Sequence, residues 1–201
     1  AVGTAAVALL SPQLQAATLT DNYANIAQTG FEDSLATAEV LGSSIEELIA
    51  KPSAEALQAA RAAWLEARVP YQQTEAYRFG NAIVDEWEGK VNAWPLDEGL
   101  IDYVDASYGT DSDNNVLYVA NVIANPQVVI GGKNINASVL TPELLSEQLQ
   151  EAGGSEANVA TGYHAIEFLL WGQDLNGTNA GAGNRAHTDF DADNCTNGHC
   201  E

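Results

Sequence analysis

The sequence predicts an all-α protein, folded as an up-and-down bundle of helices. Between residues 21 and 50, apolar residues recur at steps of three and four, which is the period of an amphipathic helix. Pro52 ends this segment, Ser53 offers a cap for the next one, and a second periodic segment covers residues 54–79. Long helices with short, proline-marked connections are typical of helical bundles.

The middle of the chain is less regular. Within the second helix, Pro70 predicts a kink or a break near Val69, because proline cannot donate a backbone hydrogen bond. Residues 116–123 could form a helix or a short strand. Gly131 and Gly132 indicate a turn.

Two further helices are expected near the C-terminal side. Thr141 followed by Pro142 is a helix start, and that helix should end near residues 153–154. Ser155 is expected to cap another helix, which runs to about Trp171 and stops at a glycine. Beyond this point the chain is rich in Gly, Asn and Asp and has no periodic segment.

The charge balance restricts the partners of the protein. Seven Lys and Arg residues face 28 Asp and Glu residues, a formal net charge of -21. Nucleic acids and anionic lipid surfaces present phosphates, which such a chain repels. The acidity favours cations, whether metal ions or basic peptides, unless it serves solubility alone.

The first residues resemble the end of a secretory signal peptide. Residues 1–10 form a short apolar segment, which Pro12 ends, and residues 15–17 offer a small-residue cleavage region. About ten apolar residues are too few to span a bilayer as a helix. We expect residues 1–17 to be a signal-peptide remnant, the alternative being an alanine-rich helix, and residues 18–201 to be an exported domain that does not span the membrane.

The two cysteines agree with export. Four residues lie between Cys195 and Cys200 in a polar loop, and in an oxidising compartment the two would form a disulfide. A thiolate zinc site with His199 is the alternative, but it lacks a fourth ligand.

The strongest chemical signal is the pair His164 and Glu167. Residues three apart share a helical face, so the imidazole and the carboxylate can converge on one ion or proton. This donor set suits iron, zinc or copper. The alternative is a salt-bridged pair at the surface.

A second stripe joins polar and aromatic residues at steps of four, three, four and three: Trp64, Arg68, Tyr71, Glu75 and Arg78. Such a face fits neither a typical surface nor a typical core, so it predicts either a functional cleft or a structural network of ion pairs. A third group, around Trp94, offers carboxylate oxygens at Asp97, Glu98 and Asp102.

These segments resemble the imelysin-like family. The resemblance rests on ARVPY at 67–71, TEAYRFG at 74–80, NAWPLDE at 92–98, IDY at 101–103 and GYHAIEFLLWGQD at 162–174. It implies two bundle-like helical halves, a periplasmic or outer-surface location and a role in iron or haem acquisition. The family continues for about as many residues again, so the resemblance implies that this chain is the N-terminal portion.

The resemblance also assigns residues. His164 and Glu167 match the signature pair of the family, and Glu75, Arg78, Asp97 and Glu98 match recurrent positions expected near a cleft between the halves.

Three functions remain open. The first is a metal-binding protein for iron or zinc, with His164 and Glu167 as ligands, Glu75, Asp97 and Glu98 as co-ligands, and Arg68 and Arg78 orienting carboxylates.

The second is a metal-dependent peptidase with Glu167 as the base, although a metallopeptidase needs about three protein ligands and the sequence supplies no complete set. The third is a non-catalytic module that binds a peptide or an iron-uptake partner through four aromatic residues, Trp64, Tyr71, Trp94 and Trp171.

Overall fold

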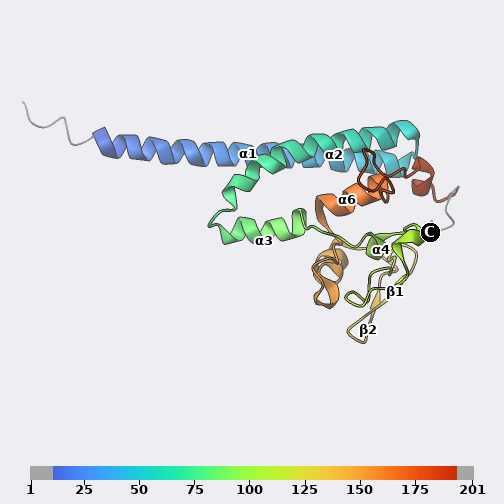
Figure 1. Cartoon of the computed structure of the whole chain (residues 1–201). Coiled ribbons are helices and arrows are strands. Elements are labelled where there is room, and N and C mark those ends of the chain that lie inside the picture. The colour runs from blue at the N-terminus through green and yellow to red at the C-terminus, as the bar shows by residue number, and fades with distance from the viewer. Residues whose placement is uncertain (1–10, 194–201) are drawn as a thin grey trace, which may run out of the picture.

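Two long antiparallel helices form the frame of the protein. The computed structural model describes residues 11–193, with side chains from residue 18 onward. Helix α1 (Ser11–Ala50) and helix α2 (Ala54–Thr74) lie side by side (Figure 1). The Ser53 hydroxyl accepts a hydrogen bond from the Ala56 amide at 3.0 Å, so the predicted cap is confirmed.

Helix α2 continues through Pro70, so the break considered from the sequence is wrong. The chain then forms a 3-10 turn, η1 (Glu75–Tyr77), close to the predicted end. Because the helix is not broken, residues on the two sides of Pro70 keep their helical spacing. Trp64 and Tyr71 therefore lie on one face of α2, and both are buried.

The remaining elements are shorter. In chain order they are α3 (Ala82–Val91), α4 (Glu98–Ile101), η2 (Ala106–Tyr108), β1 (Gln127–Ile130), β2 (Lys133–Asn136), α5 (Pro142–Leu144), the π-helical turn η3 (Leu145–Leu149), η4 (Ala152–Gly154), α6 (Gly162–Trp171) and η5 (His187–Phe190). The protein is mostly helical, with one small sheet of two strands in the described residues.

The sheet is an antiparallel hairpin that the sequence did not predict. Its turn, at Gly131 and Gly132, was predicted, and both glycines have positive φ angles, 56° and 78°. Residues 116–123, expected as a helix or a strand, form turns instead. Asn115 explains part of this, because its side chain accepts from the Leu117 amide at 3.0 Å and holds a local turn.

Two helix boundaries also differ from the expectation. The helix that starts at Thr141 changes to a π turn and ends at Leu149 rather than near residue 153. The helix expected from Ser155 begins only at Gly162. The buried side chain of Asn158 donates to the Ala152 carbonyl at 2.6 Å, and this contact keeps the preceding segment out of a helix.

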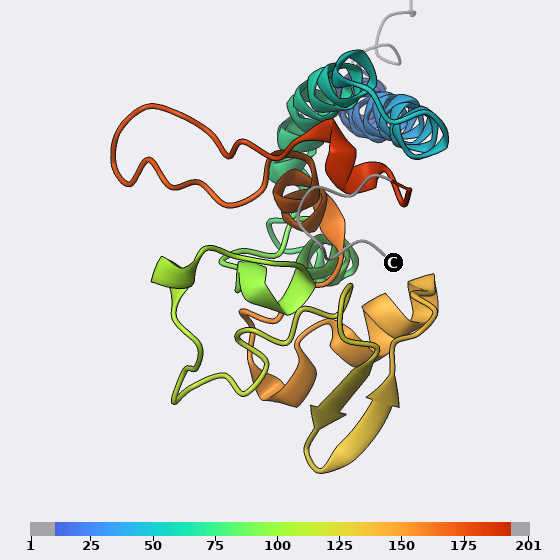
Figure 2. The ribbon, with the colours of Figure 1, turned by 90° about the vertical axis from the view of Figure 1, so that its right-hand side faces the viewer.

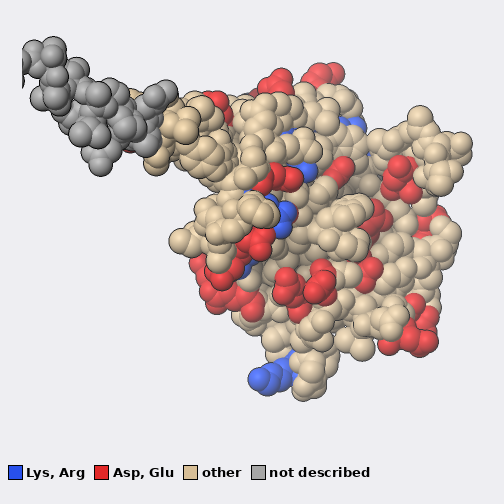
Figure 3. All heavy atoms as spheres, turned by 60° about the vertical axis from the view of Figure 1, so that its left-hand side comes forward, with Lys and Arg blue, Asp and Glu red and all other residues tan. Residues whose placement is uncertain are grey.

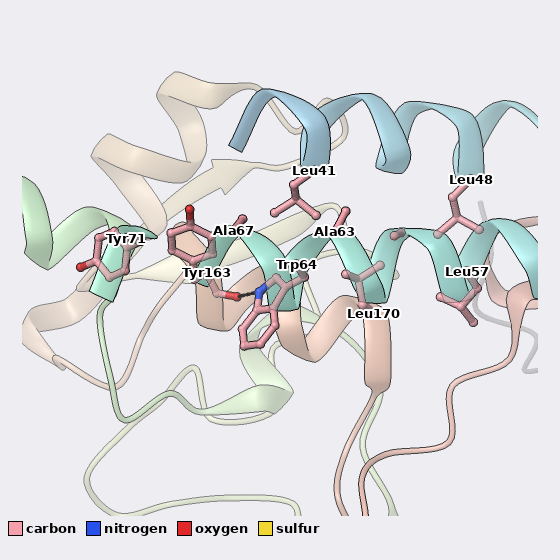
Figure 4. Close-up of a cluster of buried hydrophobic side chains, with 10 residues drawn as sticks. Leu41, Leu48, Leu57, Ala63, Trp64, Ala67, Tyr71, Tyr163 and Leu170 are labelled. Atoms are coloured by element: carbon pink, nitrogen blue, oxygen red, sulfur yellow. Dashed lines mark hydrogen bonds between the residues drawn. The ribbon is translucent and has the colours of Figure 1, made fainter. Parts of the chain in front are cut away.

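Helix α6 packs against the α1–α2 pair through the main core. The buried cluster comprises Leu41, Leu48, Leu57, Ala60, Ala63, Trp64, Ala67, Tyr71, Tyr163 and Leu170 (Figure 4). A second cluster unites α5, η3, the hairpin and the loops before it, and includes Leu100, Leu117, Val128, Leu144 and Leu149. Figure 2 shows α6 between the long helices and this lower part.

Several expectations at the termini stay predictions. Residues 11–17 belong to α1, whereas residues 1–10, the other part of the expected signal-peptide remnant, lie outside the described residues. The expected disulfide between Cys195 and Cys200 also lies outside them. Among the described helices, none combines the length and the hydropathy needed to cross a membrane.

Candidate metal centre beside helix α6

Helix α6 starts in close contact with the end of α3. A Cβ atom on Gly162 would lie 2.5 Å from the Val91 carbonyl oxygen and 2.8 Å from that of Lys90, and the φ angle of Gly162 is +87°. The Thr161 hydroxyl donates to the Lys90 carbonyl at 2.8 Å. Only glycine allows this approach, which explains the residue two positions before His164.

Helix α2 fixes the other contacts of α6. The Trp64 indole donates to the Tyr163 carbonyl at 2.9 Å (Figure 4). The Arg61 guanidinium donates to the Leu170 carbonyl from Nε at 3.0 Å and from Nη2 at 2.8 Å. One side chain of α2 thus holds the first turn of α6, and another satisfies a carbonyl of its last turn.

His164 and Glu167 lie on successive turns of α6, as predicted. The His164 Nδ1 atom is 2.8 Å from the Glu167 Oε2 atom. The His164 side chain is 17% exposed and that of Glu167 is 41% exposed, so the pair is reachable from solvent. The Trp94 ring lies 4.9 Å from the His164 ring and partly covers it.

The pair forms part of the wall of a cleft of about 750 Å³. Its lining combines aromatic side chains, three carboxylates and a glycine-rich loop: Trp64, Trp94, Phe168, Trp171, Glu98, Glu167, Asp174 and residues 181–183. A site of this size can hold a small ligand as well as an ion.

The carboxylates of the cleft influence one another. Burial raises the pKa of Glu98, and the negative charges of Asp174 and Glu167 raise it further, while Arg185 opposes them. Burial and the neighbouring carboxylates thus disfavour the charged form of Glu98. A cation in the cleft would stabilise that charged form. The electrostatics therefore favour a cationic ligand.

Two predicted co-ligands lie elsewhere. The Asp97 carboxylate accepts from the Asn115 amide at 2.5 Å and does not line the cleft. Glu75 belongs to η1, at the end of α2, and does not line it either. Of the five residues expected at the metal, the cleft unites three: His164, Glu167 and Glu98.

Within residues 11–193, no three His, Cys, Asp or Glu side chains converge closely enough to hold a metal ion by themselves. Glu98 and Asp174 share the cleft with the His164–Glu167 pair but do not complete a shell around it. The described residues fit a metal as a partial donor set, to which water or other oxygen donors would be added.

The two candidate arginines differ in their roles. Arg78 forms salt bridges with Asp85 at 2.8 Å and Glu88 at 3.1 Å, both on α3. Arg68 Nη1 instead donates to the Asn92 amide oxygen at 2.5 Å, and Asn92 donates to Glu88 at 3.1 Å. Ion pairs therefore exist along this stripe, but they join Arg78, just after η1, to α3, and they do not orient carboxylates in the cleft.

The remaining candidate residues divide between structure and site. Tyr71 is buried in the core, and Asp102 pairs with Arg185 at 2.6 Å, both side chains being at most 7% exposed. Trp64, Trp94 and Trp171 line the cleft, whereas Tyr71 does not.

Sequence reasoning missed three contributors. Asp174 lines the cleft, Arg61 holds the end of α6, and Arg185 joins the loop after α6 to α4. Asp174 ends the motif-bearing segment 162–174, so its position was the available signal. The partners of the two arginines are distant in sequence and gave no local pattern.

Comparison with known proteins gives the family of the chain. The family model described as Imelysin matches residues 27–201. The chain belongs to the Imelysin family. It is also similar to Iron-regulated protein A of Synechococcus elongatus, with 44% identity over 50 residues. The matched segment is 24% of this chain and 14% of that protein, so the relative is the longer of the two.

Proposed function

We propose that this Imelysin-family chain is an exported metal-binding protein that acts in iron uptake, with its site at His164 on α6. The observation that carries the proposal is the His164–Glu167 contact of 2.8 Å in the wall of an acidic cleft. The name of the cyanobacterial relative, an iron-regulated protein, supports the link to iron. The apolar N-terminal segment supports export to the periplasm or the outer surface of a bacterium.

The contact suggests different roles for the two residues. A carboxylate that accepts from Nδ1 selects the tautomer in which Nε2 keeps its lone pair. Histidine ligands commonly donate their second ring N–H to such a carboxylate, which fixes the ring and raises its basicity. We infer that Nε2 of His164 binds the metal and that Glu167 orients the ring through Oε2, with its other carboxylate oxygen available as a second donor.

The other carboxylates act by charge. Glu98 and Asp174 attract a divalent cation into the cleft and can bind its water ligands. Imidazole and carboxylate donors do not distinguish iron from zinc, so selectivity would come from geometry and metal supply.

Peptidase activity has weaker support. The family carries a peptidase designation, but a zinc peptidase needs about three protein ligands and an open position for water. The described residues supply no such convergent set. The aromatic lining gives more support to a second function, the binding of a peptide by Trp94 and Trp171.

Anaerobic dialysis against ferrous iron, followed by elemental analysis, tests the proposal. We expect about one iron per chain in the wild type, loss of the iron in His164→Ala, and retention in His187→Ala, a matched control outside the cleft. Equal iron content in all three proteins would refute the assignment to His164. Cleavage of an unfolded protein substrate that is abolished by Glu167→Gln and by a chelator would instead establish the peptidase.

A further inference from the structure

A second hollow, separate from the metal cleft, lies on the other side of α6. It has a volume of about 350 Å³ and runs between α1 on one side and α3 and α6 on the other. We call it the α1–α3 groove. Its walls are almost entirely apolar, with Phe31, Leu35 and Ile45 on α1 facing Trp87 and Ile166. Leu35 is 61% exposed and Trp87 is 40% exposed, so the apolar walls meet solvent.

The groove follows α1 for about four turns. From Phe31 to Ile45 the helix rises by about 21 Å, at 1.5 Å per residue. Ala38 and Gly42 lie one turn apart on the α1 wall, and a Cβ atom on Gly42 would have no neighbour within 4 Å. An elongated apolar groove with small residues on one wall fits another helix better than a compact molecule.

Acidic residues follow the edge of the groove on α1. Glu32, Glu39 and Glu46 are exposed and spaced by one heptad, so they lie on one side of the helix. Glu39 is four residues after Leu35 and three before Gly42, which places it next to both groove residues. On α3, Glu86 and Lys90 are both exposed and offset each other. The net charge of the groove edges is therefore negative. Asp and Glu also predominate over Lys and Arg on the face of the protein drawn in Figure 3.

We propose that the α1–α3 groove binds an amphipathic helix of a partner protein whose apolar face is flanked by Lys and Arg. The apolar face would fill the groove, and the basic flank would lie along the acidic edge of α1. Charge complementarity identifies this occupant. A second copy of the chain carries the same charge of -21, and an anionic lipid surface would also be repelled.

The test uses a synthetic helical peptide of about 15 residues, which spans the groove. It is built of Ala, Leu and Lys, with Leu at helical spacing and Lys on both flanks, and carries a dye. An acidic counterpart has Glu in place of each Lys. Fluorescence anisotropy gives the dissociation constants for both peptides at low and at high salt.

Four variants locate the binding site. Gly42→Gln places a side chain in the open space of the groove, and Ser43→Gln adds the same side chain at the next, exposed position of α1. Glu39→Gln removes a charge from the edge, and Glu66→Gln removes one from an exposed position of α2 that does not line the groove. None of these side chains belongs to the buried core, so the variants are expected to fold.

We expect the basic peptide to bind, the acidic one not to bind, and salt to weaken binding. Gly42→Gln should weaken binding about tenfold or more, and Glu39→Gln about threefold at low salt, while the two controls leave it unchanged. Failure of the basic peptide to bind, equal binding of both peptides, or the wild-type affinity in Gly42→Gln would overturn the proposal. His164→Ala should bind the peptide normally, so this result is independent of the metal proposal.

Discussion

The guanidinium of Arg61 on α2 donates two hydrogen bonds to the carbonyl oxygen of Leu170, 109 residues later in the chain. The acceptor lies in the last turn of α6, where backbone carbonyls have no partner within the helix. Arg61 Nη2 also donates to the Arg185 carbonyl at 3.0 Å, so one side chain joins α2, α6 and the segment that follows the cleft loop.

Arg61→Ala is therefore expected to destabilise the protein. It removes charged hydrogen bonds and leaves the Leu170 carbonyl without this partner, which costs about 2 kcal/mol in the free energy of unfolding. Urea denaturation measures this loss. Lys133→Ala, in the exposed strand β2, is the control and should change stability by less than about 0.5 kcal/mol. Equal stability of the two variants would contradict the role given to Arg61.

Two glycine substitutions should act in opposite directions. Gly162→Ala forces a Cβ atom against the Val91 carbonyl at a positive φ angle and should destabilise the protein by about 3 kcal/mol. Gly42→Ala places a methyl group in open space within α1 and should stabilise it by up to about 1 kcal/mol. Thermal unfolding distinguishes them, and a neutral Gly162→Ala would show that the close approach of α6 to α3 is not required.

The raised pKa of Glu98 predicts how the stability of the protein depends on pH. Its pKa in the folded protein is raised, chiefly by burial, above its ordinary value of 4.5. The folded state therefore binds this proton more tightly than the unfolded state, and stability falls as the pH rises from the ordinary to the raised pKa. Glu98→Gln removes this proton equilibrium.

The comparison of these two proteins is made by urea denaturation at several pH values from 4 upward. The stability of Glu98→Gln relative to wild type should increase with pH within that window and then level off. Other carboxylates titrate in both proteins and cancel in the difference. A difference that does not change with pH, or that decreases, would show that Glu98 titrates normally.

The Asp102–Arg185 salt bridge should be essential to the fold around the cleft. Both side chains are buried, and their N···O distance is 2.6 Å. Asp102→Asn leaves the guanidinium charge buried without its closest counterion, which should cost about 3 kcal/mol. The double variant Asp102→Asn with Arg185→Met should recover part of this loss. A small effect of the single variant on urea denaturation would indicate that Asp189, 3.5 Å from Arg185, is enough as a partner.

The sequence predicted the elements whose information is local. Periodicity identified α1 and α2, and the caps at Ser53 and Thr141 were correct because each depends on a hydrogen bond within three residues. The spacing of His164 and Glu167 predicted their contact for the same reason.

Other features depend on contacts that are distant in sequence. Helix α6 begins at Gly162 rather than after Ser155, because Asn158 is held by Asn115, 43 residues away. Asp97 was a reasonable ligand by residue type, but Asn115 engages its carboxylate away from the cleft. Strands β1 (QVVI) and β2 (KNIN) have four residues each and no alternation of apolar and polar residues, so they gave no periodic signal.

The central claim, a metal site at His164, is tested most directly by calorimetric titration with zinc, which has no redox chemistry of its own. Wild type and His164→Ala are titrated side by side, with His187→Ala as the control. We predict about one saturable site in the wild type and in the control, and its loss in His164→Ala. Binding of the same stoichiometry and affinity in His164→Ala, or no binding in the wild type, would contradict the claim.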